Sequence, residues 1–248
     1  MNEFSVGNTL SLGFRIWFKN LPAFLLITVL IYTPFLLWGI VAASDPGESF
    51  ERLLTFGRFS APAMMVLNTF VASALCYGVV MELQGQHAGV GTCIATGLAR
   101  FFPVLGVAML SAIATVGGFL LLVIPGLIVM CMLYVSTVVA VLERPGVMAS
   151  LHRSRELTAG RRWGVFGVLF VVGLVNFGLE KLVQVVMFDE SKLTPENVHR
   201  MVRNYIYVDL GHTVVVGSIG AVMSAVAYYL LRSEKEGTSA SELASVFE

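Results

Sequence analysis

The sequence predicts an all-α, polytopic integral membrane protein with six transmembrane helices and short interfacial helices on both sides of the membrane. Three observations lead to this fold class. Of the 248 residues 56% are hydrophobic, only 13% are charged, and mean hydropathy is +0.81. A typical soluble domain carries about 25% charged residues. A water-soluble fold of this size could not bury so much apolar surface, because folding removes only about three-quarters of a chain's surface from water.

The stretches that lack Asp, Glu, Lys and Arg give the number of spans. They enclose 25, 23, 42, 17 and 22 residues, whereas a helix needs about 20 residues to cross a hydrocarbon core of roughly 30 Å. The 42-residue stretch between Arg100 and Glu143 therefore holds two spans. Its turn is expected at Ile124-Pro125-Gly126, because proline lacks a backbone donor and glycine permits a tight turn. A domain of residues 1–232 is predicted, with spans near 21–43, 61–82, 102–123, 127–142, 163–187 and 208–231.

The basic residues predict how these spans are oriented. Six spans place both termini on one side, and that side carries ten Lys and Arg against five on the other. The positive-inside rule then makes both termini cytoplasmic. The alternative for residues 1–44 is a signal peptide cleaved after Val41-Ala42-Ala43. Its apolar run exceeds the about 7–15 residues of such peptides and contains Pro34, so a retained span is favoured. The polar tail, 233–248, is expected to be disordered.

Composition and motifs exclude several classes of function. Zero net charge and a pI near 6.9 argue against a nucleic-acid partner, which would require a basic face. Cys76, Cys93 and Cys131 have no CxxC spacing and are expected to be small apolar packing residues. The four histidines form no HExxH pair, and neither a phosphate-binding loop nor a GxSxG turn occurs. We therefore expect no catalytic residues, no cofactor and no metal, and hence no enzyme.

Short helices are predicted between the spans. On the cytoplasmic side Thr9–Lys19, Val90–Arg100 and Ala149–Arg162 are weakly amphipathic and end in basic or aromatic residues, a pattern typical of interfacial helices. This regular placement suggests three units of interfacial helix plus helical hairpin, as in a distant triplication. On the outer side Gly47–Gly57 and residues 195–207 have helical periodicity. Glu82 and Glu143 are expected to end spans, and polar residues such as Asn68 and Ser111 to join helices.

A group of polar residues on the last two spans is the first candidate site. Ionisable residues at membrane depth are functional candidates by default. Their spacing would bring the fifth and sixth spans together near the outer surface, at a substrate or proton site. The favoured alternative is a set of interfacial ion pairs and helix caps, because charges near helix ends reach the headgroups at little cost. The members of this group are Asn176, Glu180, Lys181, Gln184, Asp209 and His212.

The basic segment between the fourth and fifth spans is the second candidate site. From Arg144 to Arg162 its net charge is +4, and arginines beside a membrane bind anionic headgroups at about 1 kcal/mol each. An equally weighted explanation is that these basic residues orient the chain in the membrane, while residues of the helix such as His152 and Glu156 pair with each other. The residues expected to contact anionic lipid or a membrane-protein partner are Arg153, Arg155, Arg161, Arg162 and Trp163.

The central third of the chain resembles a known family. The run Ser150–Trp163, which contains Arg-Ser-Arg-Glu-Leu-Thr-Ala-Gly after the Pro125-Gly126 hairpin, is similar to bacterial six-helix membrane proteins. These are related to the membrane domain of some glycerophosphoryl diester phosphodiesterases and include the YciC-type proteins. The resemblance covers about 40 residues and implies a multi-pass protein of the bacterial inner membrane. It does not imply phosphodiesterase activity, because that activity belongs to a soluble barrel for which this chain has no room.

Two functions follow as expectations. The first is a non-enzymatic membrane scaffold or accessory protein that engages anionic lipid, a membrane-protein partner or a second copy through its cytoplasmic basic helices. The second is a small transporter or channel with a polar path between the fifth and sixth spans.

Overall fold

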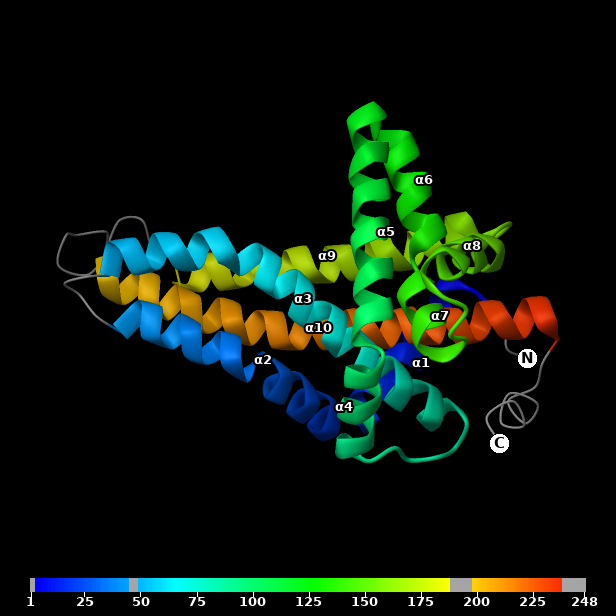
Figure 1. The fold of residues 1–248 in the computed structure, drawn as a ribbon, viewed down its shortest axis with the longest axis horizontal. Helices are drawn as coiled ribbons and strands as arrows, with labels where there is room; N and C mark the ends of the chain where they lie inside the picture. Colours follow the sequence, from blue (N-terminus) through cyan, green and yellow to red (C-terminus); the bar gives the residue numbers. More distant parts are fainter. Residues whose placement is uncertain (1–2, 45–48, 188–197, 238–248) are drawn as a thin grey trace.

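The computed structural model describes residues 3–44, 49–187 and 198–237, and within these ranges every regular element is a helix (Figure 1). The all-α prediction is therefore confirmed. In chain order the helices are α1 (Val6–Lys19), α2 (Leu21–Ser44), α3 (Ser49–Leu83), α4 (Val90–Ala99), α5 (Phe101–Leu121), α6 (Val123–Leu133), α7 (Ser136–Leu142), α8 (Val147–Thr158), α9 (Arg162–Met187) and α10 (Val198–Glu236).

Six helical stretches are long and apolar enough to cross a membrane, which confirms a multi-pass membrane protein. They match the six stretches expected from the charge-free gaps to within a few residues at most ends. The fourth one runs through both α6 and α7. Their bounds are Leu21–Val41, Thr55–Leu83, Phe101–Leu121, Val123–Leu142, Arg162–Val185 and Gly211–Glu236.

The helix α10 forms the centre of the molecule. It packs against α1, α2, α3 and α9, and these long helices run in one common direction (Figure 1). Its residues Val222, Met223 and Ala225 are completely buried. A helix that is apolar on all sides is stable only when it is surrounded by other helices or lipid, and α10 is largely surrounded by protein.

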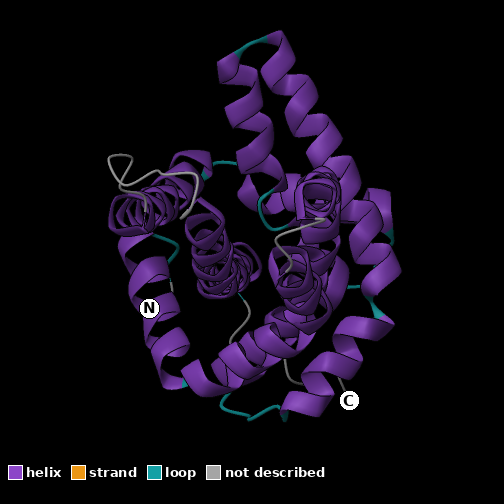
Figure 2. Ribbon diagram, turned by 90° about the vertical axis from the view of Figure 1, so that its left-hand side faces the viewer, coloured by secondary structure: helices purple, strands orange, loops and turns teal. Residues whose placement is uncertain are grey.

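The hairpin of α5 and α6 has a different direction from the rest. It projects from the side of the molecule, crosswise to the long helices, and the two views agree on this (Figures 1 and 2). The three predicted hairpins therefore do not pack equivalently, and the expected threefold arrangement is wrong. The chain turns at Leu122, so Pro125 and Gly126 lie in the first turn of α6 rather than in a loop.

The first segment predicted to be interfacial, Thr9–Lys19, forms most of α1 as a helix, but it packs against α10. Trp17 is only 8% exposed, and its indole Nε1 donates to Ser218 Oγ on α10 at 2.9 Å. One turn earlier in α1, a Cβ on Gly13 would lie 2.4 Å from the Met223 sulfur on α10. The helices α1 and α10 therefore approach each other closely. Trp17 therefore packs inside the protein, against α10.

Three predicted boundaries differ from the structure. The outer-side helix expected at Gly47–Gly57 is the beginning of α3 from Ser49 onward, and residues 45–48 lie outside the described ranges. The helix expected at 195–207 is the first part of α10 from Val198, because no helix-breaking residue separates it from the span. At the other end α10 continues through Glu236, so the tail expected to be disordered from Ser233 begins as helix. Residues 238–248 lie outside the described part.

Candidate functional site

The polar group predicted on the fifth and sixth spans is only partly brought together. On α9 the Lys181 ammonium donates to Gln184 Oε1 at 2.7 Å and lies 5.6 Å from the centre of the Phe177 ring. Glu180, Lys181 and Gln184 are exposed, and within the described residues Glu180 makes no ion pair. The side chain of Asp209 lies outside the described part of the structure.

Two members of this group have buried polar atoms. Asn176 Oδ1 on α9 and His212 Nε2 on α10 are both buried, and neither has a hydrogen-bond partner in the described structure. A buried polar atom without a partner is costly and requires an explanation. Among the described side chains no ion pair joins Glu180 or Lys181 to α10, and the Lys181–Gln184 hydrogen bond lies within α9.

The basic segment forms α8 and its two connections, and glycines determine where this helix begins and ends. Gly146 precedes the helix with φ 93°, and Gly160 follows it with φ 83°, conformations that residues with a Cβ rarely adopt. Arg144 has φ 58°, so the chain turns sharply between α7 and α8. These turns direct α8 against α7 and the end of α10, which brings Arg153 close to the carboxylates of Glu143, Glu156 and Glu236.

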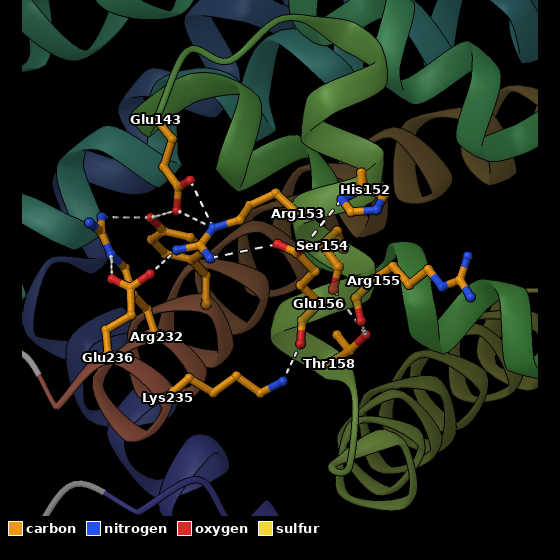
Figure 3. A network of polar contacts seen from close by, with 11 residues as sticks. Glu143, His152, Arg153, Ser154, Arg155, Glu156, Thr158, Arg232, Lys235 and Glu236 are labelled. Atoms are coloured by element: carbon orange, nitrogen blue, oxygen red, sulfur yellow. Dashed lines mark hydrogen bonds and ion pairs between the residues drawn. The ribbon is translucent and has the colours of Figure 1, made fainter.

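A neutral network of two arginines, two glutamates and a tyrosine joins α7, α8 and α10 (Figure 3). Glu143 Oε2 accepts from Arg153 Nε at 3.1 Å, and Glu143 Oε1 accepts from the Tyr228 hydroxyl at 2.8 Å. Arg232 donates to Tyr228 at 2.9 Å and to Glu236 at 2.8 Å. Arg153 also pairs with Glu236, which closes the ring. These four charged side chains are between 14% and 28% exposed, so their charges are balanced inside the protein.

A second set of contacts joins the α8–α9 connection to α10. Arg161 Nε donates to Glu234 Oε1 at 2.7 Å, and the other oxygen of Glu234 accepts from the backbone N–H of Phe4 at 3.1 Å. Lys235 donates to the backbone carbonyl of Glu156 (Figure 3). The last turn of α10 thus holds the N-terminal segment and the C-terminal part of the basic segment together.

Two hydroxyl groups of α8 lie within hydrogen-bond distance of a backbone carbonyl at the end of α6. The Ser154 hydroxyl donates to the Met132 carbonyl at 2.8 Å, and the Thr158 hydroxyl lies 3.4 Å from the same oxygen. The helix breaks at Tyr134 and Val135, so this carbonyl is one of the terminal acceptors that lack a partner within a helix. Ser154 and Thr158 are completely buried. The Ser-x-x-x-Thr spacing of the family-like run therefore has a structural purpose, which is to cap α6.

The residues predicted to contact lipid divide into two groups. Arg153 and Arg161 are paired with carboxylates of their own chain, which favours an internal role for both. Arg155 is exposed, points away from the network (Figure 3) and makes no ion pair with a described residue. Trp163 is 87% exposed. Arg162 is half-buried, and its Nε has no hydrogen-bond partner among the described residues.

A further pair of arginines lies beside this segment. Burial, and to a smaller extent the charge of Arg144, lower the pKa of Arg100 at the start of α5. Arg100 Nε is buried without a partner, and neither arginine pairs with a carboxylate in the described ranges. Two guanidinium groups near each other without an acid leave this side of the protein with uncompensated positive charge.

Sequence reasoning did not predict the pairing of Arg153 and Arg161 with the chain's own acids. Glu234 and Glu236 follow Arg232 closely and were assigned to a disordered tail, although alternating acids and bases at a helix end are a signal of helix continuation. The Glu82 carboxylate was expected only to end a helix, yet it accepts from Lys19 at 2.5 Å and contacts His87 at 2.9 Å. Asn68 joins helices as expected, because its Oδ1 accepts from Tyr32 on α2 at 2.5 Å.

Comparisons of the chain with protein families, with curated proteins and with solved structures find no match. The resemblance carried by Ser150–Trp163 therefore stays an expectation. Within the described residues no group of three or more His, Cys, Asp or Glu is placed to hold a metal ion. An open apolar groove of about 530 Å³ lies between α2 and α3, lined by aromatic, proline and aliphatic side chains that include Phe35, Trp38 and Pro62.

Proposed function

We propose that this protein is a non-enzymatic scaffold or accessory protein of the bacterial inner membrane, with both termini in the cytoplasm. Anionic lipid headgroups bind to its cytoplasmic face. The observation that carries the proposal is the set of uncompensated arginines around α8, where Arg144 and Arg155 are exposed without an acidic partner among the described residues.

The surroundings of these arginines fit an anionic headgroup. Trp163 is 87% exposed at the start of α9, and tryptophan concentrates at the membrane–water interface because its ring is amphipathic. Guanidinium groups bind phosphate oxygens in bidentate geometry. By contrast, Arg153 and Arg161 already have carboxylate partners, so we propose that they position α8 and do not bind lipid.

The test is native mass spectrometry of the full chain, purified in detergent and incubated with phosphatidylglycerol or phosphatidylcholine. We expect the protein to retain phosphatidylglycerol preferentially. Replacing Arg144 and Arg155 with Gln should weaken this binding by about 2 kcal/mol, or roughly 30-fold, since each arginine contributes about 1 kcal/mol near a membrane. The matched control is Arg58→Gln, which replaces an exposed arginine in the N-terminal half of α3. Equal lipid retention by the double variant and the control would refute the proposal.

A transporter or channel is the second candidate, and one observation favours it. Asn176 Oδ1 and His212 Nε2, on the two packed helices α9 and α10, are buried without a partner among the described residues. Such atoms occur along polar paths in membrane proteins. Replacing both residues with Leu should then abolish flux of protons or small ions into liposomes. The same double replacement in a scaffold should leave lipid retention unchanged, so the two assays separate the two functions.

A further inference from the structure

We infer that the α5–α6 hairpin lies in the plane of the membrane, surrounded by lipid acyl chains, and does not emerge on the outer side. Four of the six apolar helices then cross the bilayer, and the other two form an arm within it. The inference is independent of the proposed function, because it concerns a surface that contains none of the arginines discussed above.

The direction of the hairpin is the first argument. The helices α2, α3, α9 and α10 share one direction, and the hairpin projects crosswise to it (Figures 1 and 2). When the long helices stand across a bilayer, a crosswise element lies parallel to the membrane plane. The 21 residues of α5 extend about 31 Å at 1.5 Å per residue. This length would suffice to cross the hydrocarbon core, so the direction of the hairpin and not its length distinguishes a lateral arm from a span.

The root of the hairpin lies against the apolar part of the bundle. The Phe101 ring packs 6.0 Å from the Phe70 ring, centroid to centroid, and Val104 and Val107 are completely buried. Phe70 lies 12 residues from Glu82 and 12 from Arg58, halfway along the charge-free stretch of α3. The arm therefore begins directly after Arg100 and packs at its root against apolar side chains of the bundle.

The surface of the arm is suited to lipid. No Asp, Glu, Lys or Arg occurs between Arg100 and Glu143, and the exposed side chains are apolar on both helices and at the tip. A surface that is apolar on all sides of a helix is typical of an element within hydrocarbon. The most exposed side chains at the tip are Leu120 at 83%, Leu121 at 77%, Leu122 at 69%, Val123 at 64% and Ile124 at 71%.

The turn at the tip can also be placed in hydrocarbon. Backbone polar groups inside a bilayer must be bonded within the protein. The N–H of Leu122 donates to the Gly118 carbonyl at 3.1 Å, and the Leu122 carbonyl accepts from Gly126 at 3.2 Å. Pro125, the third residue of α6, has no N–H to satisfy. Both backbone groups of Leu122 are therefore bonded within the protein, and Pro125 removes one further donor from the turn.

The arm is fixed in its direction at both ends of its root. Ser111 Oγ on α5 lies 3.2 Å from Ser136 Oγ on α7, and the Met132 carbonyl at the end of α6 accepts from Ser154. Because the arm returns to the side from which it starts, both termini remain on the same side of the membrane whether or not it crosses.

The test places single cysteines at Leu121 and Val123 and exposes the full chain in sealed vesicles to a charged, membrane-impermeant maleimide. Cysteines at Ser49, ahead of the apolar stretch of α3, and at Gln86, behind it, mark the two sides of the membrane. The native cysteines are buried. We expect the two tip positions to remain unlabelled from either side. A nitroxide at the same positions should then collide more often with oxygen than with a water-soluble nickel complex.

Three results would overturn the inference, and each identifies a different arrangement. Labelling of the tip from the Ser49 side means that the hairpin crosses the bilayer. Labelling from the Gln86 side means that the arm lies in water. Low collision rates with both reagents, together with a disulfide between two copies at Leu121→Cys, mean that a second copy covers the tip in place of lipid.

Discussion

The Ser154 hydroxyl lies 2.8 Å from the backbone carbonyl oxygen of Met132, 22 residues earlier in the chain. This bond joins α8 to the end of α6 and gives a partner to a carbonyl that the helix break leaves without one. Because α6 is one half of the α5–α6 hairpin, this bond also couples the position of the basic segment to the direction in which the hairpin projects.

Replacing Ser154 with Ala should therefore destabilise the protein. The Met132 carbonyl would keep only the distant Thr158 hydroxyl, and an unsatisfied buried group costs about 1–3 kcal/mol. Thermal unfolding in detergent, followed by tryptophan fluorescence, measures the change. The matched control is Ser11→Ala, an exposed serine that bonds only within its own helix, for which we expect less than about 0.5 kcal/mol. Equal effects would show that the bond to Met132 contributes nothing.

Two adjacent glycines on α5 should respond very differently to valine. A Cβ on Gly118 would lie 2.9 Å from the Cα of Gly126, whereas a Cβ on Gly117 meets nothing within 4 Å. Gly118→Val should force α5 and α6 apart and cost about 1–3 kcal/mol, as expected for overpacking. Because both substitutions have the same helix propensity, the difference in melting temperature between them isolates the contact. A difference of zero contradicts the close approach of the two helices.

Arg153 and Arg155 should have separate roles, although both belong to the same basic segment. Arg153→Gln leaves Glu143 and Glu236 without their shared cation and should lower the free energy of unfolding by about 1–2 kcal/mol. That is less than the about 3–5 kcal/mol of a fully buried pair, since these carboxylates are 18% and 27% exposed. Arg155→Gln should leave stability within about 0.5 kcal/mol.

A second substitution distinguishes the network from a general effect of charge. In the Glu236→Gln background the loss caused by Arg153→Gln should become smaller, because one of the two carboxylates that Arg153 pairs with is already gone. Double-mutant cycles of such contacts give about 0.5–3 kcal/mol of coupling. Additive effects of the two substitutions would mean that the ion pair is not formed.

The tryptophans should differ in their contact with lipid. Trp163 is 87% exposed and Trp17 only 8%. In vesicles of brominated lipid, Trp163→Phe should therefore remove much of the quenchable fluorescence, while Trp17→Phe should leave the quenched component unchanged. Strong quenching of Trp17 would contradict the packing of α1 against α10.

The native cysteines should not react in the folded protein. Cys76, Cys93 and Cys131 are buried, and burial raises the pKa of the Cys93 thiol. A raised pKa means that the reactive thiolate fraction at pH 8 is smaller than for an ordinary cysteine. Mass spectrometry after maleimide treatment at pH 8 should show no added label until SDS unfolds the chain. Labelling of the folded protein would indicate that α4 separates from α3.

The number and positions of the apolar helices could be predicted because they depend on local composition. A stretch of about 20 residues without charge is apolar whatever surrounds it, so the gaps between charged residues were sufficient. The same argument fails for Trp17, because the pattern of an amphipathic helix is identical whether its apolar face meets lipid or another helix. Lipid tails and packed side chains are equally apolar.

The sequence by itself determined the six apolar stretches and the helical fold, both of which depend on neighbouring residues. The tertiary structure alone decided that Arg153 pairs with Glu236, 83 residues away, and that Arg161 pairs with Glu234, 73 residues away. It also decided the crosswise direction of the α5–α6 hairpin. The physical reason is that an arginine can pair with many acids, and a hairpin can point in many directions. Only the packing of α7, α8 and α10 brings particular groups within hydrogen-bond distance.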